Sequence, residues 1–154
     1  MATSLRTDEQ LRTALGHLEK CMETPVVPGQ LGDWLRSCRD YWVDVESTLQ
    51  VRIDEGHAEL LSEIAAQDPE LLPRVEQLLE EDIILLKKSH QFRNDADWLA
   101  AGCRQEHANQ TKIDEQLQQF TKESLEWVLR IRAQETAIVT WYQEAFNRDR
   151  GTGD

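Results

Sequence analysis

The chain has 154 residues, enough for one domain that buries about two thirds of its unfolded surface around a core. Hydrophobic residues make up 40% and charged residues 30%, with five tryptophans, which excludes an intrinsically disordered chain. The net charge of −12 repels nucleic-acid phosphates and anionic lipids, so we expect neither nucleic acid nor a membrane surface among the partners.

Neither a membrane span nor a secretory signal is expected. The longest apolar run, at residues 83–86, is far shorter than the roughly 20 residues that span a bilayer. Residues 1–6 lack the apolar region of a signal peptide. Cys21, Cys38 and Cys103 form neither an even set nor a CxxC pair. We therefore expect these thiols to be reduced and packed in the interior. We also expect a cytoplasmic protein with a single domain over residues 1–154.

Two helices are predicted in the first half of the chain from apolar residues at steps of three and four. Thr7 to Gln10 fits a capping box, and the following stripe stops before Pro25, which predicts a first helix over residues 7–23. The same spacing predicts a second helix over residues 30–66. Gly56 is its weak point, because glycine costs about 1 kcal/mol in a helix interior and can mark a bend.

Two more helices are predicted in the second half. Asp68 as N-cap and Pro69 at the first helical position start a third helix over residues 69–107. A polar stretch around Asn109 separates it from a fourth helix over residues 112–147, and residues 148–154 are expected to fray. No segment alternates apolar and polar residues, so no sheet is assigned. Long helices with short loops predict an all-α, up-down-up-down antiparallel four-helix bundle.

The first predicted helix is much shorter than its neighbours. The end of the bundle near Gln67 should therefore be covered by only three helices. We expect this end to be the surface for a homodimer or another protein partner, because an uncovered apolar patch favours association.

A set of residues in fixed order along these helices carries a family resemblance: Leu15, Leu18, Pro25, Trp34, Leu35, Pro69, Val75, Leu78, Glu81, residues 144–149 and residues 151–154. With these anchors, nearly the whole chain resembles the hemerythrin-like, or HHE cation-binding, family. The resemblance implies a four-helix bundle. It also implies a non-haem di-iron centre with several histidines and two carboxylates, used for oxygen binding, sensing or iron handling.

The sequence departs from that family at the metal ligands. Glu81-Asp82 stands where the family has a Glu-His pair, and Gln134 and Ile138 stand where it has a histidine and a glutamate. Isoleucine cannot ligate a metal, and no two of the four histidines are three or four residues apart. We therefore expect no catalytic residue, no cofactor and no di-iron centre, and we infer a non-enzymatic structural, regulatory or protein-interaction module.

One residual ligand set involves the second and third helices. Asp54 and His57 are three residues apart and, with Asp82, could form a reduced mononuclear site. The favoured interpretation of Asp54 and His57 is a solvated contact near the end of the second helix, because a single short motif has a high false-positive rate.

A second residual set combines His17 with Cys21 and Cys103 with His107, each pair four residues apart. Two cysteines and two histidines suit tetrahedral zinc. Isolated cysteines on apolar stripes usually pack as small hydrophobic residues, which is the favoured interpretation. The alternative function is accordingly an iron or zinc sensor or storage protein with a reduced site.

Loss of a metal would leave polar residues inside the bundle. Counting along antiparallel helices from the turns near Gln67 and Asn109 puts Asp82 level with residues near Ile53 and Ala137, and the nearest polar residues are Arg52 and Gln134. We expect Asp82 to be buried and paired with Arg52, with Gln134 beside them, so that a guanidinium supplies the positive charge that iron once provided. The alternative is that Arg52 points to solvent and Asp82 lies at the edge of the bundle.

Overall fold

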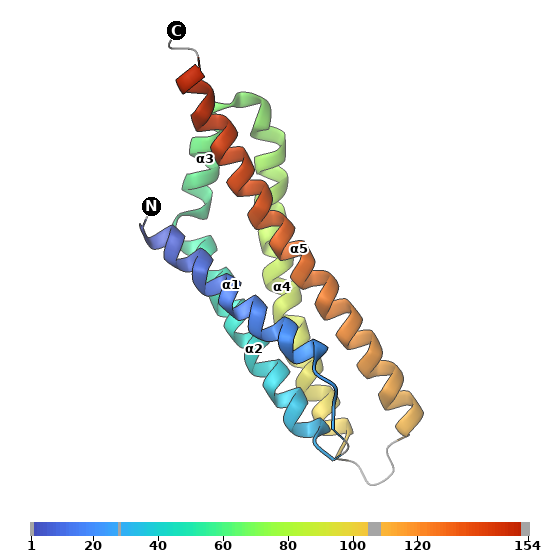
Figure 1. The fold of residues 1–154 in the computed structure, drawn as a ribbon. Helices are drawn as coiled ribbons and strands as arrows, with labels where there is room; N and C mark the ends of the chain where they lie inside the picture. Colours follow the sequence, from blue (N-terminus) through green and yellow to red (C-terminus); the bar gives the residue numbers. More distant parts are fainter. Residues whose placement is uncertain (1, 28, 105–108, 152–154) are drawn as a thin grey trace.

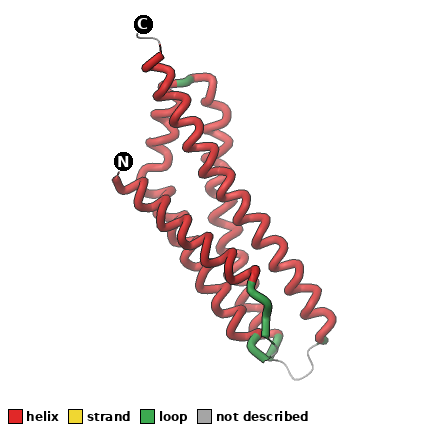
Figure 2. The backbone as a smooth tube through the Cα atoms, in the orientation of Figure 1, coloured by secondary structure: helices red, strands yellow, loops and turns green. Residues whose placement is uncertain are grey.

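The structure, a computed structural model, describes residues 2–27, 29–104 and 109–151, with side chains described for 8–27, 29–104 and 109–147. Its elements are α1 (Ala2–Glu23), α2 (Leu31–Arg52), the kinked segment η1 (Ile53–His57), α3 (Ala58–Gln67), the 3-10 turn η2 (Pro69–Leu71), α4 (Leu72–Gly102) and α5 (Gln110–Gly151). No strand occurs in this part of the chain, which confirms the all-α class (Figure 2). None of the described helices is both long and apolar enough to cross a membrane.

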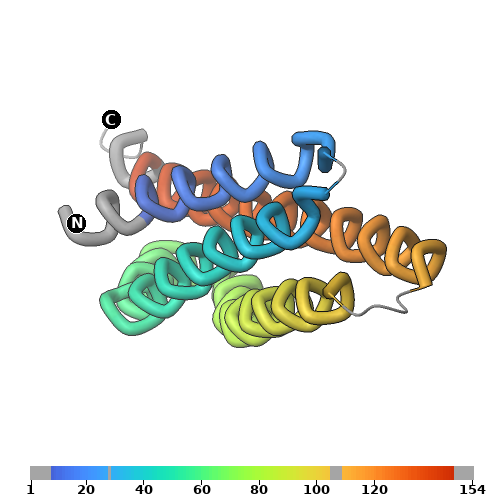
Figure 3. Tube along the Cα trace, turned by 90° about the horizontal axis from the view of Figure 1, so that it is seen from below, coloured from blue at the N-terminus to red at the C-terminus, as the bar shows by residue number. Residues whose placement is uncertain are grey.

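Four long helices pack together when α2 and α3 are taken as one kinked helix (Figure 1). Contacts join α1 with α2, α2 with α4, α4 with α5 and α5 with α1. Figure 3 shows this arrangement, with α1 and α5 on one side and α2 and α4 on the other. Beyond the kink, α3 packs against α4 and α5.

The apolar interior is divided into two clusters. The four-helix core lies among α1, α2, α4 and α5, and its largest fully buried side chains include Trp42 and Phe92, whose rings stack with centroids 4.5 Å apart. The three-helix core belongs to α3, η2, α4 and α5 and consists of Leu61, Ile64, Leu71, Val75, Leu78, Ile138 and Ala145. Among the described side chains, α1 contributes only to the four-helix core, so the end near Gln67 is built by three helices, as the short first helix suggests.

The buried positions of the long helices follow alternating steps of three and four residues. In α4 the residues at these steps are Val75, Leu78, Asp82, Leu85, Ser89, Phe92, Ala96 and Leu99, and Ala100 is buried beside the last of them. This seven-residue repeat keeps one stripe facing the neighbouring helices along a long bundle. Asp82 therefore occupies a core position of α4 although it carries a charge.

Two predicted boundaries in the first half are wrong. Helix α1 begins at Ala2 rather than at Thr7, because residues 2–6 contain no glycine or proline that would prevent a helix. The predicted second helix is interrupted, since Glu55 has φ −107° and ψ 31°, and Gly56 has φ +120° and ψ 7°. Glycine adopts a positive φ readily because it has no Cβ atom. The bend anticipated at Gly56 is thus a full break in the helix.

The predicted third helix starts as expected but is shorter. Asp68 caps its start, because its carboxylate accepts a hydrogen bond from the amide of Glu70 at 3.3 Å. The first turn is 3-10 rather than α-helical, and α4 ends at Gly102 rather than at residue 107. Residues 105–107 of the prediction lie outside the described part.

The predicted fourth helix is longer at both ends. Helix α5 begins at Gln110, directly after Asn109, whose side chain accepts a hydrogen bond from the amide of Lys112 at 3.3 Å. It continues to Gly151, so the expected fraying from residue 148 is wrong for residues 148–151. The reason is that no glycine or proline lies between Gly102 and Gly151. Residues 152–154 lie outside the described part.

A buried polar layer as the candidate functional site

A level of polar side chains separates the two apolar cores. Arg52 ends α2, Asp82 lies in the middle of α4, and Gln134 lies in the middle of α5. Asp82 and Gln134 each have residues of the four-helix core on one side along the helix and residues of the three-helix core on the other, and Arg52 lies between the four-helix core residues of α2 and the three-helix core residues of α3. His57, the last residue of η1, lies at the same level. We call Arg52, His57, Asp82 and Gln134 the polar layer.

Asp82 is the centre of the polar layer. Its Oδ1 atom accepts hydrogen bonds from Arg52 Nη2 at 3.3 Å and from Gln134 Nε2 at 3.0 Å. Its Oδ2 atom lies 2.5 Å from Nδ1 of His57. Arg52 Nη2 also donates to Oε1 of Gln134. One carboxylate of α4 thereby joins α2, η1 and α5.

The polar layer is shielded from solvent. The exposed fractions are 5% for Arg52, His57 and Gln134 and 3% for Asp82. An isolated carboxylate would carry a large desolvation cost at such a place, and the neighbouring guanidinium offsets it. Arg52 Nε, Arg52 Nη1 and His57 Nε2 are buried without a hydrogen-bond partner among the described residues. The layer therefore balances its central charge but leaves three buried nitrogen atoms without a hydrogen-bond partner in the described part of the chain.

The break at Gly56 places His57 in the layer. The buried residues of this segment are Leu49, Arg52, His57, Leu61 and Ile64, so a step of five residues separates Arg52 from His57. The non-helical backbone of Glu55 and Gly56 adds one residue to the regular spacing and shifts the buried face. Without that added residue, the spacing of three or four would bring residue 55 or 56 inward, and the imidazole would leave the core.

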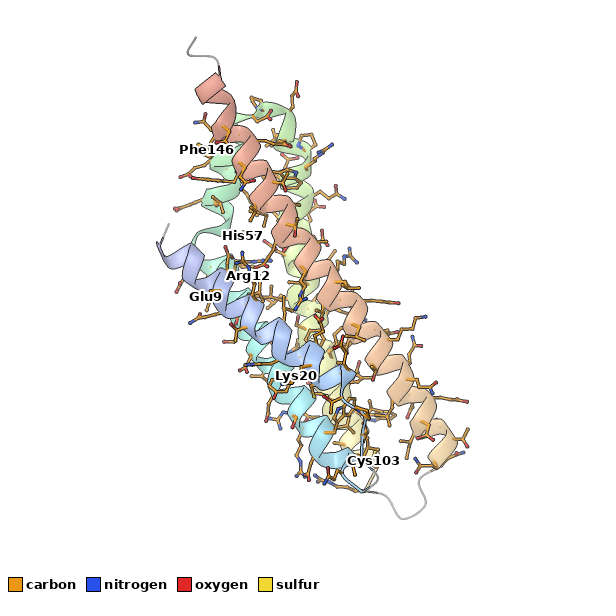
Figure 4. The ribbon with its side chains drawn as sticks, in the orientation of Figure 1. Glu9, Arg12, Lys20, His57, Cys103 and Phe146 are labelled. Carbon is orange, nitrogen blue, oxygen red and sulfur yellow. The ribbon has the colours of Figure 1, made fainter. Side chains whose placement is uncertain are left out.

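Two further carboxyl groups border the layer where α1 meets α5. Asp8 of α1 and Glu135 of α5 are both half-buried. Burial raises the pKa of both carboxyl groups, and the positive charges of Arg52 and Arg12 partly counteract this effect on the pKa. Arg12 Nε donates to Oε2 of Glu135 at 3.4 Å. Figure 4 shows Arg12 and His57 at the same level of the bundle.

The structure brings together Arg52, Asp82 and Gln134, the three residues that the sequence analysis grouped as one buried polar cluster. Arg52 does not point to solvent, and Asp82 does not lie at the edge of the bundle. The position of His57, in contrast, differs from the one expected from the sequence. The interpretation of His57 as part of a solvated contact with Asp54 is wrong, because His57 is buried against Asp82 while Asp54 is exposed and accepts hydrogen bonds from Gln50.

The described residues of the Cys and His set predicted for zinc are not grouped as a metal site. Cys21 contacts Cys38 instead of the proposed partners, with 3.2 Å between the sulfur atoms, and His17 lies beside the ring of Tyr41. His107 lies outside the described residues. Within the described part, no three or more side chains of His, Cys, Asp or Glu are grouped so that they could hold a metal ion.

Similarity to known proteins does not identify the polar layer. Comparisons with protein families, with curated proteins and with solved structures find no match to this chain. The resemblance to hemerythrin-like proteins therefore rests on the residue pattern alone.

Proposed function

We propose that this chain is a hemerythrin-like, up-down-up-down helical bundle that has lost its di-iron centre and serves in the cytoplasm as a non-catalytic structural, regulatory or protein-interaction module. The observation that carries the proposal is the buried pairing of Arg52 with Asp82. A guanidinium beside this carboxylate supplies within the protein the positive charge that a metal would supply in the related bundles.

The hydrogen bonds of Asp82 support this proposal. Both of its oxygen atoms already accept from protein donors, which come from Arg52, His57 and Gln134. A metal ion bound to Asp82 would displace some of these donors and would be repelled by the buried guanidinium. The remaining role for the layer is architectural, because a polar position in an apolar core can fix the register of neighbouring helices.

The alternative function, a metal sensor or store, has one observation in its favour. His57 and Asp82 are adjacent, and Nε2 of His57 has no partner among the described residues. A protein site of this kind needs further ligands. Asp54, the third residue considered for it, is exposed and turned towards Gln50. The structural role is therefore the better supported of the two.

Metal analysis of the protein, purified without chelators and then incubated anaerobically with ferrous iron or with zinc, tests the proposal. We expect no stoichiometric metal after gel filtration. About two iron equivalents per chain, with the absorbance of an oxo-bridged pair once the sample is exposed to air, would contradict the proposed loss of the centre. One equivalent that is retained by the wild type and lost in His57→Ala would instead support the sensor.

The three-helix end supports the interaction role. Glu135, Val139, Tyr142 and Phe146 share one face of α5, because they are spaced by three or four residues. Glu135 contacts Arg12 of α1. This face of α5 is therefore the one that α1 covers beside the four-helix core. In Figure 1, α1 and α5 separate towards the N-terminal end of α1. Val139 is 45% exposed there, beside the half-buried Tyr142 and Phe146. We propose that a second copy of the chain packs on this face.

Light scattering over a wide range of protein concentration tests the proposed self-association. The wild type should form dimers, and Val139→Lys should weaken them by placing a charge in the apolar contact. Leu129→Lys is the matched control, because Leu129 is also on α5 and is 65% exposed but lies beside the four-helix core. A wild type that stays monomeric, or equal effects of both variants, would contradict this surface.

A further inference from the structure

Cys21 and Cys38 form a thiol pair that links α1 to α2. Cys21 lies in the last turn of α1, and Cys38 is buried in the four-helix core on α2. Their sulfur atoms are 3.2 Å apart and share a hydrogen bond, and both residues are free cysteines. The spacing of 17 residues in the sequence gives no sign of this contact, which the packing of the two helices creates.

We propose that Cys21 and Cys38 are a reversible disulfide-forming site, oxidised by exchange with a low-molecular-weight disulfide such as oxidised glutathione. A disulfide bond is about 2.05 Å long, so the sulfur atoms must approach by roughly 1.1 Å. Rotation of the two cysteine side chains about their Cα–Cβ bonds is the motion that would close this gap. The site is separate from the polar layer, and the inference does not depend on the function proposed for that layer.

The surroundings of the two thiols assign them different roles. The hydrogen bond from Cys38 lowers the pKa of Cys21, which favours its thiolate, and the same bond raises the pKa of Cys38. Cys21 is half-buried, whereas Cys38 has no exposed surface. Because the thiolate is the nucleophile in exchange, Cys21 is the residue that meets an incoming disulfide.

The exchange proceeds in two balanced steps. The Cys21 thiolate attacks one sulfur of the small disulfide, which forms a mixed disulfide at Cys21 and releases one small thiolate. Cys38 then gives up its proton and attacks Sγ of Cys21, which forms the bond within the protein and releases the second small thiolate. In total, the two protein thiols lose two electrons and two protons. The small disulfide takes up these electrons and protons and becomes two thiols.

The disulfide would fix the packing of α1 on α2. These helices are already held at the same place by the Trp34 indole, whose Nε1 donates to the carbonyl of Cys21 at 3.0 Å. A covalent bond there would close the chain between residues 21 and 38 into a loop. Closing a loop of about this size restricts the unfolded chain and lowers the unfolding equilibrium constant on the order of a hundredfold.

Thiol alkylation measured by mass spectrometry tests the proposal, using Cys103→Ser to remove the third thiol. After incubation with oxidised glutathione and denaturation, neither remaining cysteine should be alkylated, and the mass should fall by the two thiol hydrogens. Reduction should restore both thiols. The matched control is the double variant Cys38→Ser, Cys103→Ser, which keeps only Cys21 and should give no disulfide within the chain.

Two results would overturn the proposal. One is full alkylation of both Cys21 and Cys38 in oxidised Cys103→Ser protein. The other is a stable glutathione adduct at Cys21, which would mean that Cys38 does not complete the exchange. Denaturant unfolding of the oxidised protein gives a second measurement, in which the expected gain must vanish on reduction and be absent from the Cys38→Ser, Cys103→Ser control.

Discussion

Nδ1 of His57 lies 2.5 Å from Oδ2 of Asp82, and this contact ties the break in the α2–α3 helix to the middle of α4. The two features depend on each other. The added residue of η1 turns the imidazole into the core, and Asp82 accepts from it there together with Arg52 and Gln134. The carboxylate therefore depends on three neighbouring segments for its partners.

Removal of the Asp82 carboxylate should strongly destabilise the fold. Asp82→Ala leaves the Arg52 guanidinium buried without its counter-charge, so we expect a loss of about 3 to 5 kcal/mol in the free energy of unfolding. Urea denaturation measures this loss. Asp97→Ala is the matched control on the same helix, because Asp97 is exposed and its ion pair with Arg39 should contribute less than about 1 kcal/mol.

The double variant Asp82→Ala, Arg52→Met shows whether the two charges depend on each other. Methionine removes the unpaired cation while filling part of the space, so much of the loss caused by Asp82→Ala should be recovered. Strictly additive losses in this double-mutant cycle would rule out the coupling inferred for the polar layer.

His57 should contribute to stability although it lies beside a break in a helix. His57→Ala removes one of the groups that contact Asp82 and leaves Oδ2 without its partner, which costs about 1 to 3 kcal/mol for a buried group. His90→Ala serves as the control, because His90 is exposed and contacts Glu46 at the surface, where changes are usually within about 0.5 kcal/mol. Equal effects in thermal denaturation would mean that His57 is not part of the buried network.

Substitution of two glycines by alanine should have opposite effects. Gly56→Ala should destabilise by about 1 to 3 kcal/mol, because its φ of +120° is strained for a residue with a Cβ atom. Gly16→Ala should stabilise by about 0.5 to 1 kcal/mol, because Gly16 lies inside α1 and an added Cβ would meet no atom within 4 Å. Denaturation of the two variants provides the comparison, and a gain for Gly56→Ala would show that the break does not require glycine.

The stability of the wild type should depend on the protonation of Glu135. Burial raises the pKa of this carboxyl above its value in the unfolded chain. The protonated form therefore contributes stability that is fully present at a pH below the unfolded pKa. This contribution is lost as the pH rises through the folded pKa. Glu135→Gln should therefore be more stable than the wild type at neutral pH. The weak pair with Arg12, which is 61% exposed, offsets little of this gain.

Urea unfolding of Glu135→Gln and wild type at several pH values tests this dependence. The difference between the two proteins should shrink as the pH falls and the wild-type carboxyl becomes protonated. A variant that is less stable at neutral pH, or a difference that is independent of pH, would mean that the pair with Arg12 outweighs burial.

The sequence by itself determined the helices and the level at which their polar residues lie. Steps of three and four residues report which face of a helix is apolar, and the turns near Gln67 and Asn109 set the register of neighbouring helices. Those two kinds of information place Asp82 close to the level of Arg52 and Gln134, and only the tertiary structure decided that Arg52 turns into the core. They also identify Gly56 as a weak point, because glycine is poorly suited to a helix interior.

The tertiary structure decided the position of His57 and the contacts between side chains of different helices. The break at Gly56 shifts the buried face by one residue, which brings His57 inward, and a regular period cannot show an inserted residue in advance. Two contacts, between Cys21 and Cys38 and between Arg12 and Glu135, depend on the distance between the helices and on the rotation of each helix about its axis. The spacing along one helix contains no information on these distances, because they arise from the packing of side chains between helices.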